Sequence, residues 1–73
     1  MKISYDEEVD AAYIRLSEQQ PSGVIEMAEG VNLDVTKDGK IVGIEILDAG
    51  TKIPLQSLFS YEYEPKMIMG KGA

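Results

Sequence analysis

An Asp-Gly pair between two runs of alternating apolar residues is the feature that most constrains this fold. In "VNLDVTKDGKIVGIEIL", Val31, Leu33 and Val35 precede the pair Asp38-Gly39, and a run dense in isoleucine and valine follows it. Alternation with period two is typical of a half-buried strand, and Asp-Gly between two such runs is among the strongest short-range signals of a hairpin. The sequence therefore predicts two antiparallel strands, with Gly39 in a positive-φ conformation at the turn.

The same stretch also matches the spacing of an EF-hand calcium loop. Asp34 falls at loop position one, Gly39 at six and Glu45 at twelve. An EF-hand loop is held between two helices, however, whereas both flanks here have the pattern of strands. Glu45 would lie six residues beyond Gly39, and at about 3.3 Å per residue it is too far up the strand to close a cage. We favour the hairpin, and assign no metal ligand and no cofactor.

The remaining patterns predict the other elements. "KISY" and "AAYIRLS" alternate on either side of the acidic turn "DEEVD" and form a second hairpin. "VIEMAEG" is a further strand that ends at Gly30, and "KIVGIEIL" is apolar on both faces in part, as expected of an interior strand. After it, Ile53, Leu55, Leu58 and Phe59 approximate helical spacing. We predict one helix over about 51–60, with Thr51 as N-cap and Pro54 in the first turn.

These elements predict an α+β fold in a single domain over residues 1–73. It is an antiparallel β-meander of four to five strands over 2–47, with one short C-terminal helix packed on one face. The tail, 61–73, opens with the alternation "YEYE" and breaks at Pro65. It is interpreted as an edge strand, or as a flexible segment that is ordered only against a partner.

The size of the chain raises the question of what stabilises it. A domain of 73 residues buries only roughly 60% of its unfolded surface, so its core is marginal without help. The chain has no cysteine and no histidine, which excludes a disulfide framework and the usual zinc ligand sets. Self-association is the remaining means, and we expect a homo-oligomer, with a dimer favoured.

Charge restricts the classes of partner. Thirteen acidic residues stand against seven basic ones, for a net charge of −6. Nucleic-acid binding needs a basic patch that displaces counterions from phosphates, so direct DNA or RNA binding is not expected, whereas a basic protein is a compatible partner. The N-terminus has no signal-peptide pattern, and no apolar run approaches the ~20 residues that cross a bilayer. We expect a cytoplasmic protein with no membrane association.

Carboxylates and tyrosines are the only candidate site residues, and each group has a structural alternative. Asp6, Glu7, Glu8 and Asp10 are either part of a hard-cation site or, as we favour, a solvated turn. Glu45 and Asp48 are either paired carboxylates for acid–base work or, as we favour, surface and capping residues. Tyrosines that could stack on a flat ligand are equally suited to a half-buried sheet face: Tyr5, Tyr13, Tyr61 and Tyr63. Three methionines, Met27, Met67 and Met69, suit an adaptable apolar surface or core filling. No residue is assigned as catalytic.

Two blocks resemble a known family. "MKISYDEEVDAAYIRLS" and "GVNLDVTKDGKIVGIEILDA" are similar to a small prokaryotic family described only as domain of unknown function 2283. The resemblance covers roughly residues 1 to 50. It implies an antiparallel sheet with a helix after "ILDA" and supplies no catalytic residues. It also implies, by analogy with family members encoded beside small candidate toxins, an antitoxin-like or partner-binding role.

The sequence thus leaves two classes of function open, beside a third interpretation in which the chain is a stand-alone relic of a larger assembly with no activity alone. The first is a self-associating protein-binding module, supported by the small size, the acidic balance and the doubly apolar strand. The alternative is a small carboxylate-based metal-binding protein or enzyme that uses the Asp6–Asp10 cluster or the Glu45–Asp48 pair.

Overall fold

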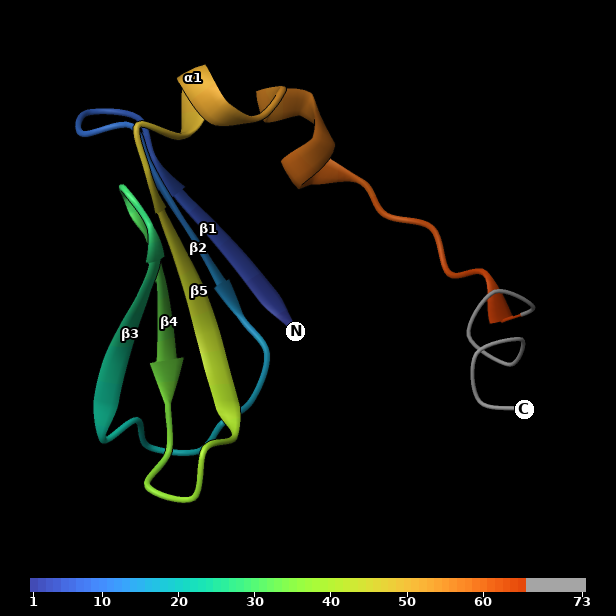
Figure 1. The fold of residues 1–73 in the computed structure, drawn as a ribbon. Helices are drawn as coiled ribbons and strands as arrows, with labels where there is room; N and C mark the ends of the chain where they lie inside the picture. Colours follow the sequence, from blue (N-terminus) through green and yellow to red (C-terminus); the bar gives the residue numbers. More distant parts are fainter. Residues whose placement is uncertain (66–73) are drawn as a thin grey trace.

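A computed structural model describes residues 1–65 of the 73-residue chain. Its five strands form one antiparallel sheet in the order β1-β2-β5-β4-β3 (Figure 1), followed by a short helix and a 3₁₀ turn. The strands are β1 (Lys2–Asp6), β2 (Ala11–Arg15), β3 (Gly23–Ala28), β4 (Val31–Val35) and β5 (Ile41–Leu47). The predicted α+β fold with an antiparallel sheet is confirmed.

Strand β5 lies at the centre of the sheet. The segment β3–β4–β5 is a meander, and β5 then pairs with β2, so the connection from β2 to β3 passes beneath the end of the sheet. The amides of Leu16 and Ser17 anchor the start of that connection by donating to Val42 O at 2.7 and 3.1 Å. The two faces of β5 differ, since Ile44 and Ile46 share one face and Gly43 and Glu45 share the other.

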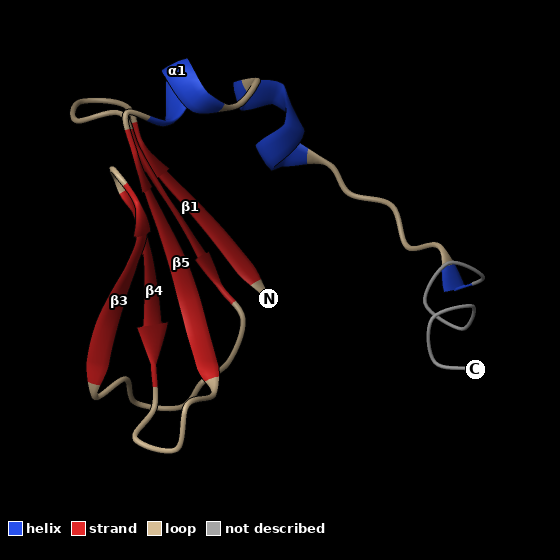
Figure 2. Ribbon diagram, viewed as in Figure 1, coloured by secondary structure: helices blue, strands red, loops and turns tan. Residues whose placement is uncertain are grey.

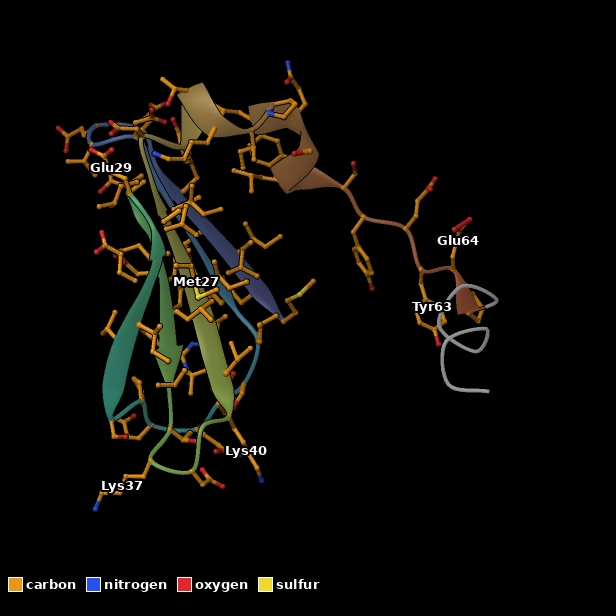
Figure 3. The ribbon with its side chains drawn as sticks, viewed as in Figure 1. Met27, Glu29, Lys37, Lys40, Tyr63 and Glu64 are labelled. Carbon is orange, nitrogen blue, oxygen red and sulfur yellow. The ribbon has the colours of Figure 1, made fainter. Side chains whose placement is uncertain are left out.

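The turn between β4 and β5 is the hairpin that the sequence predicts. The Thr36 amide donates to Lys40 O at 2.8 Å, the Gly39 amide donates to Thr36 O at 3.0 Å, and Gly39 has φ 86°. The Thr36 hydroxyl donates to Asp38 Oδ1 at 2.5 Å and accepts from the Lys40 amide at 3.0 Å. Figure 3 shows Lys37 and Lys40 at the tip of this hairpin, pointing away from the sheet.

The segment after β5 forms two short helical turns and not the one helix predicted over 51–60. The first is α1 (Ala49–Lys52), and the second is the 3₁₀ turn η1 (Leu55–Phe59). They are separated at Ile53 (φ −140°, ψ 154°) because the residue before a proline avoids helical dihedrals and Pro54 has no amide to donate.

The predicted N-cap is also one turn too late. Asp48, with φ 52°, occupies the N-cap position, and Thr51 lies inside α1, where its hydroxyl donates to Asp48 O at 2.8 Å. Figure 2 shows both helical turns at one end of the sheet. No helix within residues 1–65 is long and apolar enough to span a membrane.

The buried core is small and lies under these helical turns. Ala12, Ala49 and Leu58 form a buried cluster, and partly buried apolar side chains pack against it: Tyr5, Ile46, Ile53 and Leu55. Of the described residues with less than 2% exposure, the largest side chain is Val42. The predicted tail begins after η1 and runs away from the sheet as far as it is described (Figure 1). Met67 and Met69 lie outside the described residues.

The β4–β5 turn yields a stability prediction. A Cβ at Gly39 would meet nothing within 4 Å, so the cost of Gly39→Val comes only from forcing a β-branched residue to positive φ. We expect a loss of about 1–3 kcal/mol in the free energy of unfolding, measured by chemical denaturation. Gly39→Asn is the matched control, because asparagine tolerates this conformation; equal losses in both variants would contradict the turn assignment.

Candidate functional site

The two faces of the sheet differ in chemistry. Directly paired residues of neighbouring strands share a face, and the register aligns one row of aliphatic residues across all five strands: Ile3, Ile14, Ile44, Leu33 and Ile25. We call this the open apolar row. The next row on the same face is Tyr5, Ala12, Ile46, Val31 and Ala28. Neither row contains a charged residue. The opposite face holds Lys2, Arg15, Asp34, Glu45 and Glu26.

Helix α1 and η1 cover only part of the apolar face. Their buried cluster packs on Tyr5, Ala12 and Ile46, which belong to the row at the end of the sheet. In the open apolar row, Ile3 is 37% exposed and Ile25 is 49% exposed, and the three residues between them are only half-buried. Within the described part of the chain, the sheet therefore has a second layer at one end and none over its middle.

A shallow groove continues this surface beyond β1. It has a volume of about 310 Å³ and is lined by Met1, Ile3, Leu58, Phe59, Ser60 and Tyr61. Phe59 and Tyr61 are 76% and 77% exposed. The groove lies between the edge strand and the chain that leaves η1.

Asp10 links the β1–β2 turn to α1. Its carboxylate accepts the Tyr5 hydroxyl at 2.6 Å and the Gly50 amide at 3.0 and 3.1 Å, while its carbonyl accepts the Ala49 amide at 2.9 Å. Asp10 has φ 54°, a conformation that aspartate adopts more readily than most residues. This contact holds α1 over the end of the sheet, so the carboxylate has a structural role.

The other candidate carboxylates also make local contacts. Asp6 Oδ1 accepts the Glu8 amide at 3.0 Å, a bond that stabilises the turn itself. Glu45 Oε1 accepts the Asn32 amide nitrogen at 3.1 Å on the polar face, and Asp48 begins α1 without a side-chain capping bond. Among residues 1–65, no three carboxylates converge in a way that could hold a metal ion.

Tyr13 spans three strands on the polar face. From β2 its hydroxyl donates to Asp34 Oδ2 of β4 at 2.8 Å, so its ring crosses β5 at Gly43. A Cβ at Gly43 would overlap Tyr13 Oη and Cζ. Gly43 is therefore the residue that lets the ring lie flat on the sheet.

Both sheet tyrosines hold their protons more tightly than usual. The hydrogen bond to Asp10 is the main cause that raises the pKa of Tyr5 to about 12. The bond to Asp34 likewise raises the pKa of Tyr13. Each phenol acts as a neutral donor to a carboxylate, which is a structural use and makes neither of them an activated acid or nucleophile at neutral pH.

The comparison with known families finds one match. The family model described as "Protein of unknown function (DUF2283)" matches residues 2–49. The chain belongs to the DUF2283 family. The match covers all five strands and ends at Ala49, the first residue of α1. No curated protein and no solved structure matches the chain.

Sequence reasoning identified the apolar alternation but missed three features of the structure. These are the Asp10–Gly50 contact, the Tyr13–Asp34 bond across Gly43, and the groove beside β1. A glycine within an otherwise β-branched strand is a signal for a close approach and could have indicated the second. The other two depend on the path of the chain after β5.

The Tyr5–Asp10 bond gives a pH prediction. The folded-state pKa of about 12 exceeds the unfolded value of about 10, so the bond stabilises the fold below pH 10 and its contribution is lost as pH rises from 10 to 12. The midpoint temperature of thermal unfolding should therefore fall more steeply between pH 10 and pH 12 in the wild type than in Tyr5→Phe. Parallel pH profiles for the two proteins would contradict a phenol that donates to Asp10.

The close contact between Gly43 and the Tyr13 ring gives a packing prediction, in which the cost of Gly43→Ala depends on whether the ring is present. Gly43→Ala should displace the Tyr13 ring, break its bond to Asp34 and cost about 1–3 kcal/mol in the free energy of unfolding. In a Tyr13→Ala background the same substitution should cost clearly less, because the overlap with the ring is gone and only the close approach of the Cβ to Ile14 O, at 3.0 Å, remains. Gly23→Ala, where a Cβ meets nothing within 4 Å, is the control. Equal costs of Gly43→Ala in both backgrounds would contradict the overlap.

Proposed function

We propose that this protein is a self-associating, protein-binding module that functions as a homodimer. The observation that carries the proposal is the open apolar row, five aliphatic residues that cross the whole sheet without a second layer. A sheet with one apolar face is stable when that face packs on another layer. In the described chain, α1 and η1 supply this layer over the row of Tyr5, Ala12 and Ile46, whereas Ile3 and Ile25 of the open apolar row are 37% and 49% exposed.

A second copy is well suited to cover the row. Two antiparallel sheets pack face to face about 10 Å apart and bury their inner side chains between them. The open apolar row carries no charge, and the charged residues of the strands lie on the opposite face or at the ends. Two molecules of net charge −6 can therefore join these faces while their charges stay on the outside of the dimer.

The outer faces of such a dimer support binding of a basic protein. Glu26, Asp34 and Glu45 would lie on each outer face, and the two copies together would carry twice the net charge of −6. Electrostatic complementarity increases the rate and specificity of association with a positively charged partner. An antitoxin-like role, which the family resemblance implies, is one form of this proposal.

The dimer is tested with two variants of β3, one with a charge on the apolar face and one with a charge on the opposite face. Ile25 lies in the open apolar row and its neighbour Val24 lies on the opposite face, with exposures of 49% and 64%. Because both residues are exposed on the edge strand, an aspartate at either position should leave the fold intact. Ile25→Asp should weaken the dimer by about ten-fold or more, since it would bury a charge between the sheets, whereas Val24→Asp should have little effect. Sedimentation equilibrium over a range of concentrations gives the dissociation constants, and circular dichroism reports the fold.

The central position of the row gives a stronger form of the same test. Ile44→Asp places the charge on β5, in the middle of the sheet, and should produce a monomer or an unfolded chain. A wild-type protein that remains monomeric at all concentrations would refute the proposal. So would equal dimer affinities for the wild type and Ile25→Asp.

A further inference from the structure

Strand β1 offers an open edge to another strand. It pairs with β2 on one side only, and the outer side of an edge strand presents backbone N–H and C=O groups that can pair with an added strand. The groove of about 310 Å³ lies along this edge and includes Met1 and Ile3. The edge thus combines backbone donors and acceptors with an apolar groove.

Residues 60–64, which we call the C-terminal arm, have the pattern of a strand but lie outside the sheet. Ser60 is extended, with φ −151° and ψ 151°, and "SYEYE" alternates tyrosine with glutamate. Tyr61 and Tyr63 are 77% and 67% exposed. Figure 3 shows Tyr63 and Glu64 well away from the five strands.

The alternation of the arm complements that of β1. On the apolar face β1 presents Ile3, and on the polar face it presents Lys2, which lies directly opposite Arg15 of β2. Two like charges in direct cross-strand contact are unfavourable, and a glutamate on an adjacent strand would offset them. An arm paired with β1 would place its tyrosines beside Ile3 and its glutamates beside Lys2.

We propose that the C-terminal arm of a second copy adds to the β1 edge as an extra strand, and that the exchange is reciprocal. Tyr63 of that arm fills the groove, and Glu62 and Glu64 lie beside Lys2, while Tyr61 stays in the wall of its own chain's groove. The chain's own Phe59, Ser60 and Tyr61 form one wall of the groove, and beyond this wall its own arm carries Tyr63 away from β1. The wall leaves the groove open to an arm from outside.

This inference rests on the proposed function, because exchange requires the dimer, and it supplies contact area that the dimer needs. Five strands of about five residues form a face of roughly 24 by 17 Å, and α1 and η1 already cover one end of it. A stable interface buries about 800 Å² of accessible surface per partner. The groove extends the open apolar row at Ile3, so exchanged arms enlarge the same interface.

Cross-linking identifies which chain's arm lies in the groove. The chain has no cysteine, so each introduced cysteine is the only thiol that can react. Ser4→Cys places a thiol on β1, and Glu62→Cys places one on the arm. The two single variants are mixed and treated with a short bifunctional maleimide, and linked peptides are identified by mass spectrometry. We expect a link between residues 4 and 62, which can only join different chains. Val24→Cys, on the opposite edge of the sheet, is mixed with Glu62→Cys as the control and should give little product.

The outcomes separate this inference from the proposed function. A chain that carries both Ser4→Cys and Glu62→Cys is treated in the same way. If the 4–62 link forms within this double variant and not between the mixed single variants, the arm closes on its own β1, and the exchange is wrong while the dimer stands. A dimer that gives no such link also overturns the exchange. A wild type that is monomeric by sedimentation overturns the proposed function, and the exchange with it.

Charge reversal tests the contact between the glutamates and Lys2. Lys2→Glu should raise the dissociation constant of the dimer by about three- to ten-fold, since each dimer contains two such contacts at exposed positions. Adding Glu62→Lys and Glu64→Lys to this variant should restore the affinity. Lys37→Glu changes the net charge equally at the far tip of the β4–β5 hairpin and is the control. An effect of Lys2→Glu no larger than that of the control would refute the contact.

Discussion

The hydrogen bonds of Asp10 position the helical turns that cover one end of the sheet. This residue joins the Tyr5 hydroxyl, the Gly50 amide and, through its carbonyl, the Ala49 amide, so the β1–β2 turn and the start of α1 are held together. The direction in which α1 and η1 leave the sheet is set at this point. Ala49 and Leu58 consequently pack on the row of Tyr5, Ala12 and Ile46, and the neighbouring open apolar row receives no second layer.

The open apolar row and the C-terminal arm are connected features. A sheet that lacks a second layer over its middle has an incomplete core, and an arm with an alternating pattern outside the sheet has no backbone partners. In the proposed dimer, a second copy would meet both requirements through one continuous surface, because Ile3 belongs to the row and also lines the groove beside β1. The polar face, where Tyr13 bonds to Asp34 across Gly43, then remains on the outside.

Much of the fold could be predicted because its signals are local. The Asp38-Gly39 turn and the alternation of Val31, Leu33 and Val35 require only dihedral preferences and the period of a strand. The prediction of one helix over 51–60 was wrong because it relied on the apolar spacing and took Pro54 as part of the first turn. In the structure Pro54 separates α1 from η1. The candidate site was harder, since a carboxylate such as Asp10 has the same local pattern whether it binds a cation or caps a backbone amide.

The sequence by itself determined which residues share a face, where the chain turns, and that the strands are antiparallel. These properties follow from side-chain alternation and turn chemistry over a few residues. Only the tertiary structure decided that β5 lies between β2 and β4, that Asp10 binds Gly50 forty positions away, and that Ile3 and Ile25 at the two ends of the open apolar row stay exposed. Such contacts join residues that are distant in the chain, and no local pattern specifies which distant partner a strand edge or a carboxylate will meet.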